Sequence, residues 1–363
     1  MNKTGLRIRK RDEMGKAHAF IIRLTAIALS LVVCAFIIVA VTHLNPFQVY
    51  GGIINGAVGN NRRLWVTIRD IMVLLIVSVG LVPAYKMKFW NIGGEGQILM
   101  GGLASAALMI YAGSHMPDWL LLVCICASSC AAGMIWGIIP AFFKAKYNTN
   151  ETLFTLMMNY VAMQLVTFCI VYWEHPKGSN TVGIINSASC AGWFPKLFGL
   201  QYGLNVLLVL FITVLVFLYL RYTKHGYELS VVGESPNTAR YAGINVKKVI
   251  IRTMALSGAV CGFAGSLIVS GASHTVSTSL AGGRGFTAII VAWMSHFNPF
   301  AMAAVSGLLV FMEKGAVQIA SQFGLNQNVS DILSGVILFF LIGSEFFINY
   351  EVMTVKKIPE AAK

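Results

Sequence analysis

The chain has 363 residues, of which 57% are hydrophobic and only 11% are charged. Soluble globular proteins of this length carry far more charge, so the composition excludes a soluble enzyme or binding module. The net charge of +13 would suit a nucleic-acid polymer as partner. No basic groove with interleaved aromatic residues lies outside the apolar segments, however, so no such partner is expected.

Apolar runs of bilayer length recur along the chain, and they are continuous rather than alternating, which favours helices over a β-barrel. The sequence predicts an all-α polytopic membrane protein with about ten transmembrane helices and a single transmembrane domain over residues 1–363. The eighth span is short, so it is tilted, broken or continuous with the ninth. The predicted spans are residues 20–41, 67–86, 95–112, 119–143, 152–172, 204–221, 250–271, 285–297, 300–320 and 332–349.

The N-terminal segment is predicted to be retained. It contains Asp12 and Glu13, and the apolar run from Phe20 to Val41 is long enough to span a bilayer and lacks a small-residue cleavage site. We therefore expect a tail at residues 1–19, a helical bundle at 20–349 and a second tail at 350–363.

Basic residues gather in alternate connections, as the positive-inside rule requires. If the N-terminus is cytoplasmic, 20 of the 27 lysines and arginines fall on the inside, and an even number of spans places both termini there. The inside segments are 1–23, 86–90, 143–151, 221–252 and 354–363. The seven basic residues that fall elsewhere are Arg62, Arg63, Arg69, Lys177, Lys196, Arg284 and Lys314.

Cysteine and histidine patterns predict neither a disulfide framework nor a metal site. All seven cysteines except Cys190 lie in apolar segments, where packing is the expected role. The seven histidines have no metal-ligand spacing and are assigned no chemistry.

A polar, glycine-rich stretch, Asn91-Ile92-Gly93-Gly94-Glu95-Gly96-Gln97, stands where the third span should begin. Hydrocarbon penalises charges, amides and broken backbone unless the segment lines a cavity or is buried in protein. The stretch therefore indicates a pathway for a polar solute.

The same pattern of Gly-Gly-charge-Gly opens the eighth span at residues 282–286. By the topology above, the two copies face opposite sides of the membrane, which is typical of inverted repeats in transporters. We expect two halves of about five helices with broken helices at residues 93–97 and 282–286. Free N–H groups at such helix starts would bind a neutral polar solute, and glycine would let it approach.

Ten residues are candidates for the solute pathway. Two alternatives stay open: membrane amides often bridge helices, and Glu95 can bond the N–H groups of its own helix start. The glycines of the seventh span, Gly258, Gly262 and Gly265, are assigned to helix packing. The pathway candidates are Asn91, Gly93, Gly94, Glu95, Gly96, Gln97, Asn159, Gly283, Gly285 and Phe286.

The inside loop at 221–250 contains a predicted short helix that starts at Ser235-Pro236 and ends at Gly243. A short, rigid helix with small residues on one face suits docking to a partner, although an ordinary amphipathic surface helix is the alternative. The candidate docking residues are Gly233, Glu234, Pro236, Ala239, Arg240, Tyr241, Ala242 and Gly243.

Residues 91–97 resemble the Asn-Ile-Gly-x-Glu-Gly-Gln signature of permease subunits of bacterial ABC importers for nucleosides and simple sugars. The loop at 233–244, Leu256-Ser257-Gly258-Ala259, Gly283-x-Gly285-Phe286 and Asn298-Pro299 are similar to later motifs of that family. The resemblance runs from about residue 45 to 345 and is strongest to the nucleoside subgroup. The chain departs from the pattern at Ser235, Asn237 and Thr238 and in the charged pair Glu313-Lys314.

The resemblance implies a multi-pass permease in the bacterial cytoplasmic membrane, among membrane lipid. Its implied partners are two ATPase subunits, a second permease and an extracytoplasmic substrate-binding lipoprotein. The resemblance also implies that the helix at 235–243 couples to the ATPase through the candidate docking residues named above. No Gly-x-x-x-x-Gly-Lys-Ser/Thr motif occurs in the sequence, so ATP and magnesium are expected to be used by the partner, with no cofactor on this chain.

Three alternatives to a nucleoside importer remain. One is a simple-sugar importer of the same class. Another is an ion-coupled carrier that relays protons through Glu95, Glu313 and Glu345. The third, a membrane-embedded hydrolase, lacks a catalytic constellation, because packing explains Ser257 and Ser306.

Overall fold

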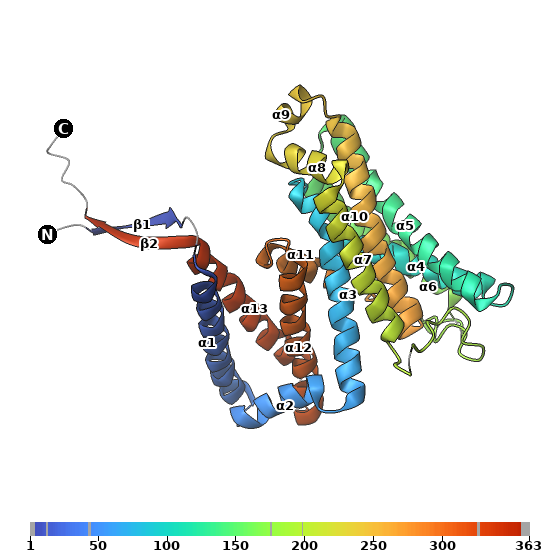
Figure 1. Cartoon of the computed structure of the whole chain (residues 1–363). Coiled ribbons are helices and arrows are strands. Elements are labelled where there is room, and N and C mark those ends of the chain that lie inside the picture. Colours follow the sequence, from blue (N-terminus) through green and yellow to red (C-terminus); the bar gives the residue numbers. More distant parts are fainter. Residues whose placement is uncertain are drawn as a thin grey trace. The chain divides into compact units, whose positions relative to one another are not determined.

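The computed structural model describes residues 4–11, 14–42, 45–174, 176–197, 199–324 and 327–356. Over these residues the architecture is helical, with one short pair of strands (Figure 1). The chain divides into two compact units, residues 1–64 with 309–363 and residues 65–308, and the division falls within α3 and within α12. Each of the ten predicted spans falls on a helix, and seven helices among the described residues are long and apolar enough to cross a membrane.

The first unit contains α1, α2, α13 and the end of α12. Arg23 on α1 forms an ion pair with Glu345 on α13, with 2.7 Å between Nη2 and Oε1. A Cβ on Gly315 of α12 would lie 2.3 Å from the Cγ2 of Ile53, so α2 and α12 pack closely. The helices are α1 (Lys16–Thr42), α2 (Pro46–Val58), α12 (Pro299–Phe323) and α13 (Gln327–Asn349).

Both tails of the chain enter a two-stranded antiparallel sheet, β1 (Thr4–Lys10) with β2 (Tyr350–Lys356), in which Arg7 lies opposite Met353. The sequence predicted only tails here. The pairing brings the two tails together, as expected when an even number of spans separates them. Lys3, Lys357 and Lys363, which were assigned to the inside, lie outside the described residues.

The second unit is built around α10, which continues without a break into the π-helical turn η1 (Val269–Ser273). In the most apolar stretch of this continuous helix, 83% of the residues are buried. The surrounding helices are α3 (Asn61–Lys86), α4 (Gly94–Ala112), α5 (Asp118–Tyr147), α6 (Glu151–Trp173), α7 (Gly203–Tyr222), α10 (Val246–Ile268), α11 (Arg284–Met294) and the start of α12.

Glycines allow α4, α5 and α10 to touch backbone to backbone. A Cβ on Gly133 of α5 would lie 2.2 Å from the carbonyl oxygen of Gly258, and one on Gly101 of α4 would lie 2.1 Å from that of Gly262. The hydroxyl of Ser129 donates to the same Gly262 carbonyl at 2.5 Å. The packing role predicted for the glycines of α10 is therefore confirmed, and close backbone approach of this kind is typical of membrane helices.

The eighth span is short and broken from the ninth. Its helix, α11, has 11 residues and ends in a turn in which His296 and Phe297 adopt positive φ before α12 starts at Pro299. This agrees with the prediction of a short or broken eighth span.

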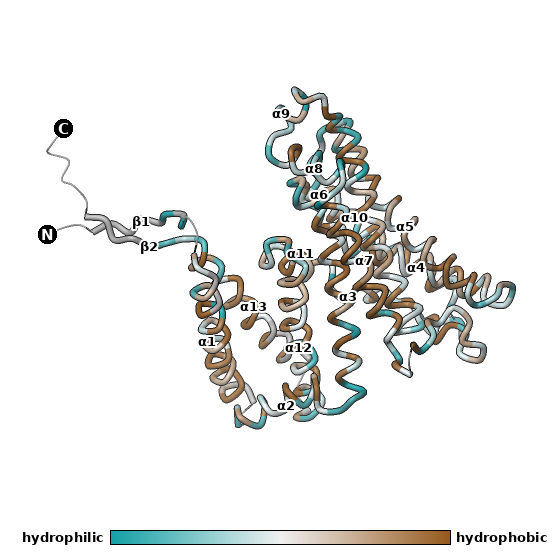
Figure 2. The backbone as a smooth tube through the Cα atoms, in the orientation of Figure 1, coloured by the Kyte–Doolittle hydropathy of each residue, from teal (hydrophilic) through white to brown (hydrophobic). Residues whose placement is uncertain are grey.

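The long connection between α7 and α10 folds into two helices, α8 (Lys224–Glu234) and α9 (Pro236–Tyr241). The hydroxyl of Ser235 accepts a hydrogen bond from the N–H of Thr238 at 3.2 Å, and Gly243 takes φ +76° two residues after the end of the helix. The start and end predicted for α9 are confirmed, whereas α8 was not foreseen. Figure 2 shows hydrophobic residues along α3 and α10 and more hydrophilic ones around α9.

Candidate functional site

The helical backbone is interrupted before α4. Two asparagine side chains form hydrogen bonds with the backbone groups of the interrupted segment. The Asn91 amide oxygen accepts from the N–H of Gly93 at 2.9 Å. Asn159 on α6 donates to the carbonyl of Ile92 at 3.0 Å and accepts from the N–H of Gly96 at 2.9 Å. Buried backbone groups need such partners, because an unpaired polar group in an apolar surrounding is costly.

A second set of contacts ties this segment to α10. The Asn91 amide nitrogen lies 3.5 Å from the Gln97 side-chain oxygen and 3.4 Å from the Ser257 hydroxyl. All three residues are buried. In this structure Asn91 and Asn159 bond protein groups, which favours the interpretation that these amides bridge helices. Their direct contact with a solute stays a prediction.

Glu95 joins the two glycine-rich segments. Its Oε1 accepts from the N–H of Gly283 at 2.8 Å, and its Oε2 accepts from the N–H of Gly285 at 2.8 Å. The alternative that Glu95 caps its own helix is wrong, because its carboxylate binds the N-terminus of α11. The positive end of the α11 dipole favours a carboxylate at this point.

Glycine at residue 285 makes this junction possible. A Cβ there would lie 2.3 Å from the backbone nitrogen of Glu95, and a Cβ on Gly94 would lie 3.6 Å from the Gly285 Cα. The close approach at Gly285 is therefore made by the backbone of α4. Around Gly283 a Cβ would meet nothing within 4 Å, and Phe286 is 44% exposed. Gly283 and Phe286 are therefore more open than Gly94 and Gly285.

Arg284, which lies between the two glycines at the start of α11, belongs to a buried cluster of charged residues. Asp70 on α3 accepts from Arg69 at 2.8 Å, and the Arg284 guanidinium approaches the same Asp70 oxygen at 3.5 Å. The Asp70 side chain is only 3% exposed. The three charges line a cavity of about 230 Å³ together with hydroxyl groups, including those of Ser273 and Thr275.

The sequence prediction missed Asp70 and Arg69 as site residues. The signal was available: two adjacent charges within an otherwise apolar span are costly, so they are expected to face a polar cavity or to pair. Arg284 was seen only as part of a repeated pattern. Its pairing with Asp70 and its place between the two N–H groups bound by Glu95 join the cluster to the broken helices.

One face of the predicted docking helix, α9, packs against the rest of the second unit, and its other face is exposed. Ala239 is fully buried in an apolar cluster with Leu229 and Val249, and Tyr241 is 93% exposed. A Cβ on Gly233 would lie 2.2 Å from the Lys86 carbonyl oxygen, so α8 packs directly on the end of α3. Exposed positions of α9 and its end, Arg240, Tyr241, Ala242 and Gly243, are thus presented on a supported helix.

The support under α8 includes a buried histidine. The ring of His225 lies 3.0 Å from the Tyr219 hydroxyl through Nδ1 and 3.3 Å from the Thr253 hydroxyl through Nε2. Burial lowers the pKa of His225 below its usual range, which outweighs the opposing effect of a hydrogen bond to the backbone at Val249. The neutral ring therefore links α7, α8 and α10 through hydroxyl groups.

The candidate residues thus form two groups in the second unit. One group contains the broken-helix segments, which contact each other through Glu95, and the other is the segment from Gly233 to Gly243. Phe286 and the open backbone at Gly283 lie in the first group, and Glu234 and Pro236 belong to the second. The arrangement provides a polar junction inside an apolar bundle and a rigid projection at a loop.

Comparison with known proteins gives relatives over nearly the whole chain. The guanosine ABC transporter permease protein of Bacillus subtilis is 28% identical over 340 residues, covering 93% of this chain and 97% of the relative. The nucleoside ABC transporter permease protein of Lactococcus lactis is 27% identical and covers 96% and 98%. The glucose ABC transporter permease protein of Haloferax volcanii is 28% identical and covers 85% and 84%.

The match to a protein family extends over residues 64–342 and includes both broken-helix segments and α9. The chain belongs to the family of the permease component of branched-chain amino acid transport systems.

Proposed function

We propose that the chain is a permease subunit of an ATP-driven importer that carries a nucleoside across a bacterial cytoplasmic membrane. The names of the relatives support the solute class, because guanosine and nucleoside permeases match more than nine-tenths of this chain. The observation that carries the proposal is the junction at Glu95, where two interrupted helices meet inside an apolar bundle. Interrupted helices of this kind form solute sites in transporters.

The proposed mechanism divides the work between this chain and its partners. The permease forms the pathway, beside a second permease, and an extracytoplasmic binding lipoprotein delivers the nucleoside. Two ATPase subunits bind ATP and magnesium and move α9, whose exposed residues Arg240 and Tyr241 provide the contact. The motion passes through the buried base of α8 and α9 to α3 and α10, and the pathway opens to alternate sides.

Stacking on an aromatic side chain would help to select the solute. The open backbone at Gly283 and the half-exposed ring of Phe286 lie at the start of α11. An aromatic face of this kind binds a nucleobase by stacking, whereas the N–H groups of Gly283 and Gly285 are already bonded to Glu95. The glucose permease of Haloferax volcanii makes a simple sugar the second candidate.

An ion-coupled carrier is disfavoured by the partners of its acidic residues. Glu345 pairs with Arg23 at 2.7 Å, and Glu95 is held by two backbone N–H groups. A proton relay through either carboxylate would have to break these contacts each time a proton passes.

The test is uptake by the assembled transporter in proteoliposomes. We expect labelled guanosine to accumulate when ATP is enclosed with the ATPase subunits, and to continue when the proton gradient is collapsed. Unlabelled glucose in excess should leave guanosine uptake unchanged. Uptake that needs a proton gradient and ignores ATP would overturn the proposal, and accumulation of glucose without guanosine would replace the nucleoside by a sugar.

A further inference from the structure

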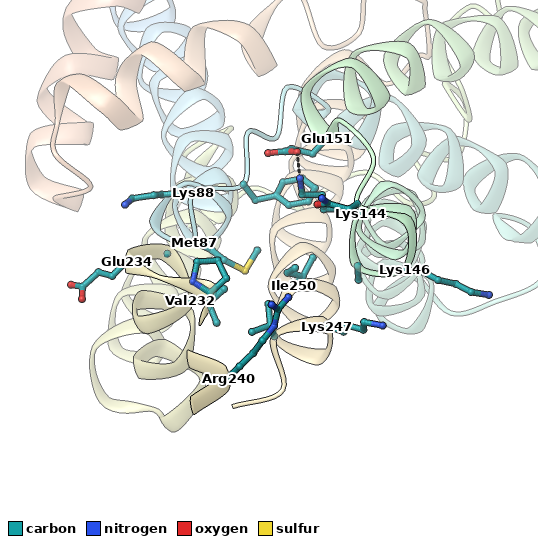
Figure 3. A pocket seen from close by; sticks show the side chains of 16 residues that line it. Met87, Lys88, Lys144, Lys146, Glu151, Val232, Glu234, Arg240, Lys247 and Ile250 are labelled. Atoms are coloured by element: carbon teal, nitrogen blue, oxygen red, sulfur yellow. Dashed lines mark ion pairs between the residues drawn. The ribbon is translucent and has the colours of Figure 1, made fainter. Parts of the chain in front are cut away.

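A cavity of about 560 Å³ lies beside α9, where the α8–α9 segment faces the connections that flank α4 and α6 (Figure 3). Its walls come from four parts of the second unit: the end of α3 with the chain that follows it, the α5–α6 connection, the α8–α9 segment and the start of α10. The lining includes five basic residues and two acidic ones: Lys88, Lys144, Lys146, Arg240, Lys247, Glu151 and Glu234.

The charges inside the cavity are not balanced. Lys144 pairs with Glu151 at 2.8 Å, so these two charges offset each other. Figure 3 shows Arg240 directed toward the middle of the cavity, whereas Glu234, Lys88 and Lys146 are directed away from it. Among the described residues Arg240 contacts only the neutral side-chain oxygen of Asn237, at 3.3 Å, and no ion pair involves Lys247.

The start of α10 adds to this positive character. This helix has 23 residues and no acidic residue in its first turn, which carries Lys247 instead. Within the described part of the chain, the backbone N–H groups of Val246 and Lys247 have no acceptor. A positive side chain at a helix N-terminus is unfavourable unless an anion lies nearby.

The remaining walls are apolar and argue for more than a bare ion. Met87, Phe89, Val232 and Ile250 line the cavity between the basic residues. The volume greatly exceeds that of one phosphate and lies within the range of small-molecule sites, which combine apolar walls with a few placed polar groups. Arginine and lysine together are the usual protein partners of a phosphate group.

We propose that this cavity binds an organic phosphate, with the phosphate group held by Arg240 and Lys247 and the apolar part against Phe89 and Ile250. The phosphate comes either from a soluble nucleoside monophosphate or from the headgroup of an anionic lipid. Both share the chemistry of a phosphate ester. A ligand here bridges α9 and the start of α10, so it holds α9 on its support and changes how the helix moves.

The experiment measures binding of labelled guanosine monophosphate to the assembled transporter in nanodiscs of neutral lipid. Lys247→Gln and Arg240→Gln should each weaken the dissociation constant at least fivefold. Lys248→Gln is the matched control: it removes the same charge from the neighbouring residue, which does not line the cavity, and should change affinity less than twofold. Guanosine without the phosphate should not compete, and inorganic phosphate should compete weakly.

A second arm identifies the source of the phosphate. If nanodiscs that contain phosphatidylglycerol abolish binding of the monophosphate, and the lipid itself is retained in a way that depends on Lys247 but not on Lys248, the lipid is the ligand. Equal weakening by all three variants, or equal binding of guanosine and its monophosphate, would overturn the proposal. The readout is binding, so it is independent of the solute that the permease carries.

Discussion

The carboxylate of Glu95 bonds the backbone N–H of Gly285 at 2.8 Å, across 190 residues of sequence. The bond connects the start of α4 to the start of α11, and its partner bond to Gly283 flanks Arg284 on the other side. Arg284 in turn approaches Asp70. The start of α11 is thus held through its backbone by a carboxylate from α4 and through the Arg284 side chain by a carboxylate from α3.

Replacing Glu95 by glutamine should weaken this junction more than the small change in shape suggests. The glutamine amide nitrogen is a donor, so one of the two backbone N–H groups loses its acceptor. Hydrogen bonds to charged groups contribute about 1.5–3 kcal/mol each. We expect a loss of about 2 kcal/mol in stability and a several-fold loss of uptake, and a larger loss of both for Glu95→Ala.

Thermal unfolding of the assembled transporter in detergent, with transport in proteoliposomes, measures both effects. Asp118→Asn is the control, because this exposed carboxylate lies in the first turn of α5. A Glu95→Gln protein as stable and active as the parent would show that the junction contributes little.

The glycine contacts between α5 and α10 should tolerate no methyl group. In Gly258→Ala the new Cβ would lie 2.3 Å from the Gly133 carbonyl oxygen, so the helices must separate. Overpacking of this kind costs about 1–3 kcal/mol. Gly335→Ala in α13 is the matched control: its Cβ meets nothing within 4 Å, and alanine favours helix.

Melting temperatures of the two variants measure the difference. Gly258→Ala should melt several degrees below the parent and Gly335→Ala at or above it. Equal melting temperatures would mean that α5 and α10 are further apart in the protein than this packing requires.

Hydropathy was sufficient to predict the helices that coincide with the ten apolar spans, because an apolar run of bilayer length has few alternatives to a helix. The ten predicted spans all fall on helices, and the turn signals at Ser235 and Gly243 located α9 correctly. Two glycine-rich patterns were enough to locate helix starts within residues 93–97 and 282–286.

The partners of those segments could not be predicted in the same way. A carboxylate such as Glu95 can bond any helix start within reach, and only the packing of α4 against α11 decides which. The β1–β2 pairing depends on a contact between the two ends of the chain, and no local pattern encodes it. The adjacent charges Arg69 and Asp70 could have been noticed within an apolar span, but the pairing of Asp70 with Arg284 joins residues more than two hundred positions apart and has no local signal.

Asp70→Asn should leave two arginines without their carboxylate. Breaking a buried ion pair by removing one partner costs about 3–5 kcal/mol, because an uncompensated charge stays behind. The double variant Asp70→Asn/Arg284→Gln should be more stable than Asp70→Asn alone, since it also removes one of the stranded charges.

A double-mutant cycle on unfolding of the assembled transporter gives the coupling between Asp70 and Arg284. Its matched comparison is the pair Lys224 and Glu228, which are 3.8 Å apart and of which the lysine side chain is 89% exposed; this pair should show coupling of about 0.5 kcal/mol or less. Additive effects at Asp70 and Arg284 would mean that the 3.5 Å approach stabilises nothing.

Stability of the transporter should fall as the pH is lowered below about 6.5, the usual pKa of a histidine. The pKa of His225 is lowered by burial, so the unfolded chain takes up a proton at a higher pH than the folded one. The stability provided by the neutral ring is therefore complete above the unfolded pKa and is lost as pH falls through the folded pKa. His274, whose pKa burial also lowers, contributes in the same direction.

His225→Gln should reduce this dependence on pH without abolishing it, because His274 remains. Melting temperatures between pH 5 and pH 8 measure the slope, and His115→Gln, which changes an exposed histidine, is the control. An identical slope in the parent and in His225→Gln would contradict the role given to burial at this site.

The exposed side of α9 should be required for coupling and not for folding. Tyr241 is 93% exposed, and among the described residues the Arg240 side chain forms a hydrogen bond only with Asn237, so Tyr241→Ala and Arg240→Glu should change the melting temperature little. If α9 receives the motion of the ATPase, both variants should lose most ATP-driven uptake while the ATPase keeps a basal turnover that solute no longer stimulates. Gly243→Pro should act more strongly, because φ +76° at this residue is closed to proline.

Uptake and solute-stimulated ATP hydrolysis, measured together on one preparation, separate uncoupling from misfolding. Normal stimulation in a stable Arg240→Glu or Tyr241→Ala transporter would remove α9 from the coupling pathway.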